Sequence, residues 1–413
     1  MNNILNYFKI AWKSLGQQKS RTILTIIALS IGIALLIIMF AAGEGLKGMV
    51  LSELDIYNPN TISIEIKVPG KGNVSSATSM AGGNNITTLK NKDIEAIAKL
   101  KNIKSYFSYV TGQEIFKYKN ANQAGIIFGY GYAASEMQKL ETKAGRFYTK
   151  EEEESLAAVV VLGSKIKENL FGDQEAINEN VYIRGLPFKV VGVLKEQGGG
   201  FMDMDSISYI PTKTIQKKLL GTDYVVGVLV EVIDPEKINN TKDDIQFLMD
   251  ERHNITDPEK RDFQAMTMAE AKEMVNTVLN AITLLLVALT FISLIVGGVG
   301  ITNIMYVSVI ERTFEIGLRR AVGAKRNDVR YQFLAEAIIL TFFGGVFGII
   351  IGAGVALVIY FLALAIGLNW TYNVSVFSII LALAFSGCLG FVFGVFPAQK
   401  AAELDPITAL RKD

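Results

Sequence analysis

Four long apolar runs divide the chain. They cover residues 22–43, 276–305, 336–366 and 376–398. A helix needs about 20 apolar residues to cross the hydrocarbon core of a bilayer, so each run predicts a transmembrane helix. A signal peptide is the alternative for the first run, but its apolar region would be shorter and a small-residue cleavage site would follow. The later spans also need an internal N terminus, so we predict that the first span is retained.

Between the first and second runs, residues 44–275 change to mixed patterns, and this length can bury a core of its own. Isoleucine or valine alternates with polar residues over 60–68, which predicts a half-buried strand. A helix at 88–100 and a strand at 103–111 complete a β-α-β unit. A second unit follows as strand, helix and strand at 224–232, 234–253 and 262–266. Two such units can pair as a split β-α-β layer of ferredoxin type, with 112–222 as an insertion of short strands and helices.

The fold class predicted from these patterns is a helical membrane protein with four transmembrane helices and a large α+β domain between the first two. The chain is half hydrophobic and its mean hydropathy is +0.32, which suits a membrane protein with a sizeable soluble part. A cytoplasmic amphipathic helix is predicted at 1–21, because apolar side chains gather on one side with lysines opposite. Residues 367–375 predict an external turn, and 399–413 a cytoplasmic tail.

Charge sets the orientation of the spans. Residues 1–21, 306–335 and 400–413, together with Glu336, hold 13 basic and 7 acidic residues, and the other 28 basic and 33 acidic residues fall in 44–275. Short segments rich in Lys and Arg stay in the cytoplasm, so both termini and the 306–335 loop are predicted to be cytoplasmic and 44–275 extracytoplasmic. The balance does not indicate nucleic-acid binding.

The 306–335 loop has the most specific pattern of charges and helix-end residues in the sequence. Its glutamates and arginines stand at helical i,i+3 and i,i+4 spacings, Gly323-Ala324 marks a helix end, and Asp328 would lie in the first turn of the next helix. Such a short charged helix at the cytoplasmic face is a candidate docking surface for a soluble partner. The alternative is a basic loop that satisfies the inside-positive rule and binds nothing.

The run Glu-Arg-Thr-x-Glu-Ile-Gly-Leu-Arg-Arg-Ala-x-Gly-Ala, starting at Glu311, resembles the signature loop of the FtsX/MacB family of ABC-transporter permeases. In that family the loop is a coupling helix that contacts the ATPase subunit. The resemblance therefore implies an ATPase-coupling role for the matching positions, which are Glu311, Arg312, Glu315, Ile316, Gly317, Leu318, Arg319, Arg320, Gly323 and Ala324.

The insertion also resembles this family. Gly145-Arg146, the apolar run that ends at Gly163, Leu170-Phe171, and Phe188-x-Val-Val-Gly-Val occur in the order found in the MacB periplasmic core domain. The resemblance implies a porter-like part, here 44–111 and 223–275, interrupted by a second subdomain at 112–222. MacB itself carries a fused ATPase domain that this sequence lacks, so the resemblance implies a separate ATPase subunit.

The family resemblance implies a permease in the bacterial inner membrane that acts as a dimer, either of itself or with a paralogous permease. ATP bound by the partner ATPase would drive efflux by mechanotransmission, with an adaptor of the membrane-fusion type as a further partner. Antibiotic efflux is one expected role, and macrolides, peptides and lipoproteins all fit as substrates. A lipoprotein-releasing permease of the LolC/LolE type, an FtsX-like regulator of a cell-wall hydrolase and a plain membrane sensor are the alternatives.

Enzyme chemistry has no supporting pattern in the sequence, so we predict no catalytic, metal or cofactor residues. There is no Gly-x-x-x-x-Gly-Lys-Ser/Thr for ATP and no His-Glu-x-x-His for zinc. We interpret His253 as a solvated residue at a helix end and Cys388 as a small packed residue. Met202-Asp203-Met204-Asp205 is either an exposed loop or a cation site, with the loop favoured. Glu336, at a membrane boundary, is expected to reach water.

Overall fold

The computed structural model describes residues 19–54, 58–69, 87–196 and 203–410, which form two compact units. Unit 1 takes the described residues up to Gly48, then Thr277–Ala365 and those from Trp370 onward. Unit 2 takes the described residues of Met49–Asn276 and Ile366–Asn369. The helix predicted at 1–21 lies almost wholly outside the described residues.

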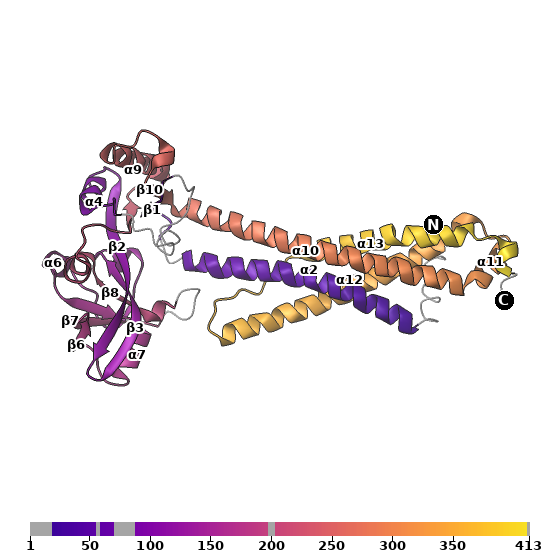
Figure 1. The fold of residues 1–413 in the computed structure, drawn as a ribbon, viewed down its shortest axis with the longest axis horizontal. Coiled ribbons are helices and arrows are strands. Elements are labelled where there is room, and N and C mark those ends of the chain that lie inside the picture. Colours follow the sequence, from indigo (N-terminus) through magenta and orange to yellow (C-terminus); the bar gives the residue numbers. More distant parts are fainter. Residues whose placement is uncertain (1–18, 55–57, 70–86, 197–202, 411–413) are drawn as a thin grey trace. The chain divides into compact units, whose positions relative to one another are not determined.

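Unit 1 is built from long helices and two short ones, shown in Figure 1. The helices are α2 (Lys19–Leu54), α10 (Met268–Glu311), α11 (Thr313–Ala321), α12 (Arg326–Ala365), α13 (Val376–Glu403) and α14 (Pro406–Leu410). In the described part of the chain, α2, α10, α12 and α13 are long and apolar enough to cross a membrane. The predicted fold class is therefore confirmed. Three of these helices extend well beyond the predicted spans, and the position of the bilayer along them stays a prediction.

Small residues let α12 pack closely against two neighbours, as is typical of membrane helices. Gly348 shows the geometry: a Cβ built there would lie 2.6 Å from the Ile33 Cβ and 2.8 Å from the Ser30 carbonyl oxygen, both on α2. Gly344 and Gly352 also face α2, and Gly390 and Gly394 of α13 face α12. Packing within one subunit thus accounts for these spaced glycines. Gly297 and Gly300 on α10 have nothing within 4 Å of such a Cβ.

Unit 2 contains a ten-stranded sheet in the described part of the chain, with α-helices against it (Figure 1). Along the sheet the order is β10-β1-β9-β2-β3-β8-β5-β7-β4, and β6 pairs with β2 and β7. The strands are β1 (Thr61–Ile66), β2 (Ile103–Tyr118), β3 (Ala121–Tyr130), β4 (Thr142–Gly145), β5 (Val159–Leu162), β6 (Asn180–Ile183), β7 (Leu186–Leu194), β8 (Ile207–Pro211), β9 (Gly227–Val232) and β10 (Phe263–Thr267).

The predicted split β-α-β layer is present as β1-α4-β2 and β9-α9-β10. All pairs in the order β10-β1-β9-β2 are antiparallel, with Ile64 opposite both Ala265 and Val228. The prediction that the strand from Ile103 ends at Thr111 is wrong, because β2 continues to Tyr118 and pairs with β3 along that extension. The polar residues beyond Thr111 interrupt the apolar pattern, so the sequence did not predict this extension, although one face of the extended strand stays buried.

Helices and short turns connect these strands. The α-helices are α4 (Asn91–Ile97), α5 (Ala134–Met137), α6 (Lys150–Glu154), α7 (Ser164–Phe171), α8 (Thr212–Thr214) and α9 (Ile238–Arg252). The other helical turns are η1 (Met204–Ser206), η2 (Ile215–Leu220, a π-helix), η3 (Pro235–Lys237) and η4 (Pro258–Lys260). Isoleucines of α4 and α9 pack with the inward side chains of β1 and β9 in one apolar core, which covers that face of the ferredoxin-like strands.

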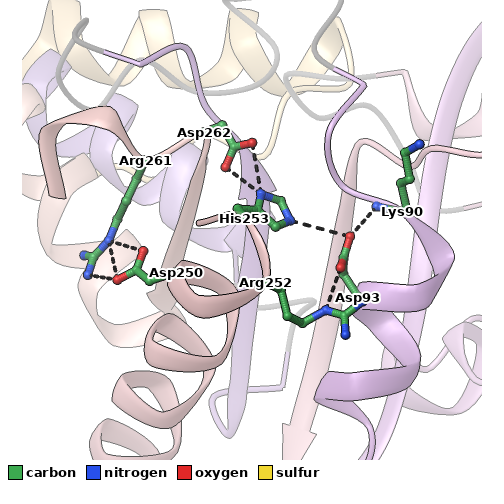
Figure 2. A network of polar contacts seen from close by, with 7 residues as sticks. All are labelled: Lys90, Asp93, Asp250, Arg252, His253, Arg261 and Asp262. Carbon is green, nitrogen blue, oxygen red and sulfur yellow. Dashed lines mark hydrogen bonds and ion pairs between the residues drawn. The ribbon is translucent and has the colours of Figure 1, made fainter. Parts of the chain in front are cut away.

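A polar network fastens the two β-α-β halves to each other (Figure 2). The Asp93 carboxylate on α4 accepts hydrogen bonds from the Lys90 backbone N–H at 2.9 Å and the Arg252 Nε at 2.7 Å. His253, at the end of α9, places Nδ1 2.8 Å from the Asp262 Oδ1 and Nε2 3.5 Å from the Asp93 Oδ2.

The interpretation of His253 as a solvated residue is wrong, because its side chain is only 10% exposed. The hydrogen bond to Asp262 raises the pKa of the His253 imidazole above its ordinary value, against the opposing effect of burial. The charged imidazolium therefore stabilises the contact between the halves.

Candidate functional site

A turn at its C-terminal end sets the position of α11 between the second and third long helices. Gly323 has a φ of +112° and follows the end of α11. Its N–H donates to the Arg320 carbonyl at 3.2 Å, and the Ala324 N–H donates to the Arg319 carbonyl at 3.1 Å. These two bonds are the Schellman arrangement that ends a helix with glycine in a left-handed conformation. The predicted helix end at Gly323-Ala324 is confirmed, and both residues shape the turn.

Asp328 stabilises the start of the next helix. Its Oδ2 accepts a hydrogen bond from the Lys325 backbone N–H at 2.9 Å, and it lies in the first turn of α12 as predicted. A carboxylate in this position also interacts favourably with the positive end of the helix dipole. The connection from α11 to α12 is therefore short and fixed by hydrogen bonds.

The outward face of α11 combines apolar and charged side chains. Phe314, Leu318 and Val322 recur at i, i+4 and i+8 and are 56%, 49% and 83% exposed. Beside them, the Arg319 guanidinium forms an i,i+4 ion pair with the Glu315 carboxylate at 2.5 Å, which realises a predicted helical spacing. Arg319 also donates to the Gln332 Oε1 on α12 at 2.8 Å, so this face is held to the third long helix.

The inward face of α11 contacts the end of the chain. Ile316 and Gly317 are buried, and a Cβ at Gly317 would lie 2.6 Å from the Ala409 Cβ on α14. The Arg320 guanidinium donates from Nη1 to the carbonyls of Ala402 at 3.1 Å and Leu404 at 2.5 Å. The structure thus divides the six predicted residues within α11: Glu315, Leu318 and Arg319 face outward, whereas Ile316, Gly317 and Arg320 pack inward.

Arg312 occupies the N-cap position of α11, without a capping hydrogen bond from its side chain, and Glu311 is the last residue of α10. The Arg312 Nη1 lies 3.2 Å from the Glu336 Oε1 on α12, with the two side chains 12% and 2% exposed. The expectation that Glu336 reaches water is therefore wrong. Burying a carboxylate alone would be very costly, and Arg312 supplies the opposite charge.

Sequence reasoning missed the residues that only the fold brings to α11. Gln332 and Glu336 lie on α12, and Ala402, Leu404 and Ala409 lie near the end of the chain. Phe314 and Val322 could have been predicted from the sequence, because their i,i+8 spacing with Leu318 between them is typical of an apolar stripe on a short charged helix.

Two of the candidate cation-site residues, Asp203 and Asp205, have polar partners in the described part of the chain. Asp203 pairs with the Lys165 Nζ at 2.7 Å and Asp205 accepts from the Ser164 hydroxyl at 2.8 Å. No three His, Cys, Asp or Glu side chains gather there as a metal site, within the ranges described. Cys388 is exposed on α13, so its interpretation as a packed residue is wrong.

Known proteins resemble this chain over its whole length. The model of the MacB-like periplasmic core domain matches residues 22–248, and that of the FtsX-like permease C-terminal matches residues 287–406. The "Macrolide export ATP-binding/permease protein MacB" of Bdellovibrio bacteriovorus is 34% identical over 416 residues, which cover 100% of this chain and 62% of that protein. The protein of the same name from Chlorobaculum tepidum is 34% identical over 412 residues, covering 99% and 62%.

This chain thus spans 62% of the length of these curated relatives. Among solved structures, the periplasmic region of MacB from Actinobacillus actinomycetemcomitans is similar, with 21% sequence identity and a TM-score of 0.46. That similarity covers 55% of this chain and 97% of the other chain.

Proposed function

This chain belongs to the family of the MacB-like periplasmic core domain joined to an FtsX-like permease domain, and from that premise we propose that it is the membrane permease subunit of an ABC transporter. ATP is bound and hydrolysed by a partner ATPase subunit, and this chain is not itself an enzyme. The relatives are named for macrolide export, so macrolides are the first substrates to test, followed by peptides and lipoproteins.

One observation carries the proposal: the outward face of α11. An exposed apolar stripe of Phe314, Leu318 and Val322 beside the Glu315–Arg319 ion pair has the composition of a protein contact, an apolar centre with charges at its rim. The helix that carries it is short and fixed at both ends, so a force applied to it moves α10 and α12, to which it connects.

The mechanism we propose is mechanotransmission. Closure of two ATPases at the cytoplasmic side displaces α11 in each copy of a permease dimer, and the long helices pass that displacement to the external domains. Substrate then leaves through the external domains, with an adaptor protein of the membrane-fusion type, and does not cross between the spans. Both termini lie in the cytoplasm, and the membrane is the bacterial inner membrane.

The decisive experiment exchanges the two charges of the docking face without removing their ion pair. In the double variant Glu315→Arg and Arg319→Glu opposite charges remain at i and i+4, while each position reverses the charge that it presents to a partner. The variant also loses the Arg319 bond to the Gln332 Oε1, so its thermal unfolding is measured alongside. We expect copurification with the ATPase subunit and ATP turnover in lipid nanodiscs to be lost. The matched control is Lys150→Glu with Glu154→Lys, an exposed i,i+4 pair on α6 in unit 2.

The control exchange should leave both measurements unchanged. An α11 double variant that binds and activates the ATPase as well as the wild type would refute the docking role of this face. A wild-type chain that binds no ATPase would refute the transporter proposal itself and favour an ATPase-independent sensor.

A further inference from the structure

We infer that Arg320 couples α11 to the fourth long helix, so that motion of α11 reaches α13 as well as the helices to which α11 is joined by the chain. This inference rests on the proposed function, because the motion is the one that the partner ATPase would cause. Arg320 is then a positioning residue, and its role is distinct from docking.

The first argument is the geometry of the Arg320 side chain. Its Nη1 donates to the carbonyls of both Ala402 and Leu404, where α13 ends. The last carbonyls of a helix have no partners within that helix, and they carry the negative end of its dipole. A guanidinium in this place satisfies two such groups with its positive charge, so it holds the end of α13 at a fixed distance from α11.

The second argument is the contact of Gly317 with α14. The Ala409 methyl group lies where a side chain at position 317 would be, so the two helix backbones approach as closely as small residues allow. Asp405 fixes the start of α14, since its carboxylate accepts from the Thr408 backbone N–H at 3.1 Å. Gly317, Arg320, Ala402, Leu404 and Ala409 together form what we call the α11–α13 latch.

The third argument is that the latch is not built for maximal stability. The Nε of Arg320 is buried and, within the described residues, has no hydrogen-bond partner. A buried donor without an acceptor lowers stability. The two Nη1 bonds are therefore the hydrogen bonds of the Arg320 side chain that the described residues show.

The test measures the latch directly, in the full chain in lipid nanodiscs. Spin labels are placed at Ala321→Cys on α11 and Glu403→Cys on α13, both exposed positions, in a Cys388→Ser background. We expect a narrow distance distribution from dipolar broadening, both without nucleotide and with the ATPase subunit trapped by ATP and vanadate. Arg320→Gln should broaden it in both states, and Arg320→Lys should retain it, because lysine also donates to carbonyls.

Ala409→Leu opens the latch by a different route, since the space beside Gly317 holds only a methyl group, and it should broaden the distribution in the same way. In turnover assays Arg320→Gln should bind the ATPase as the wild type does, yet lower ATP turnover by roughly fivefold or more. Unchanged thermal unfolding of Arg320→Gln distinguishes a positioning role from a structural one.

Three results would overturn the inference. They are an unchanged distribution in Arg320→Gln, a wild-type distance that changes with nucleotide, and loss of ATPase binding in Arg320→Gln, which would make the latch part of the docking surface. If the wild type binds no ATPase, the proposed function fails, while the nucleotide-free distances still decide whether Arg320 holds the two helices together.

Discussion

Gly348 offers a quantitative test of how unit 1 is held together. An alanine Cβ there would lie 2.6 Å from the Ile33 Cβ, whereas ordinary contacts begin at 3.4 Å, so α2 and α12 must separate by about 0.8 Å. Overpacking of this kind costs about 1–3 kcal/mol. Glycine to alanine within a helix also gains about 1 kcal/mol from helix propensity, which partly offsets that cost.

The matched control is Gly354→Ala on the same helix, where a Cβ would have nothing within 4 Å. Both substitutions share the propensity gain, so their difference isolates the packing cost of about 1–3 kcal/mol. For a domain of 150–250 residues, each kcal/mol shifts Tm by about 2–4 °C, so Gly348→Ala should melt about 2–12 °C below Gly354→Ala.

The assay is thermal unfolding of the full chain in detergent, followed by tryptophan fluorescence. In a Trp12→Phe background the signal comes from Trp370 alone, which packs against Gly45 of α2 within unit 1. Equal melting temperatures for the two variants would refute the reasoning, because they would mean that α2 and α12 are not in the close contact described.

Two further predictions concern buried charges. Glu336→Gln or Arg312→Met alone should lower the free energy of unfolding by up to about 3–5 kcal/mol, because a buried pair loses one partner. The double variant Arg312→Met with Glu336→Leu should recover most of the lost stability. A single variant as stable as the wild type would contradict the buried pair. In unit 2, the raised pKa of His253 means that its stabilisation is complete below about pH 6.5 and is lost as the pH rises through the folded-state pKa. The amides of α4 and α9 should therefore lose protection from hydrogen exchange, corrected for the intrinsic rate, toward pH 8 in the wild type but not in His253→Asn. Identical pH profiles of protection in the two proteins would exclude this linkage.

Periodicity was sufficient for the main architecture. The long apolar runs determined the four helices, because only a helix satisfies its backbone in lipid without a partner strand. Alternation and helical spacing in 60–111 and 224–266 likewise predicted both β-α-β halves. The local signature from Glu311 identified the family, and its i,i+4 charges predicted the Glu315–Arg319 ion pair.

Contacts between distant segments were decided only by the tertiary structure. The sequence assigned Arg320 and Gly317 to a partner contact, but the end of the chain folds back on them, with Arg320 on the carbonyls of Ala402 and Leu404. Position at a membrane boundary predicted an exposed Glu336, but Glu336 is buried in an ion pair with Arg312. Position at a helix end predicted a solvated His253, but the His253 side chain is largely buried between Asp93 of α4 and Asp262 beside β10. In each case the side chain's environment comes from another element, and spacing within one element carries no information about that neighbour.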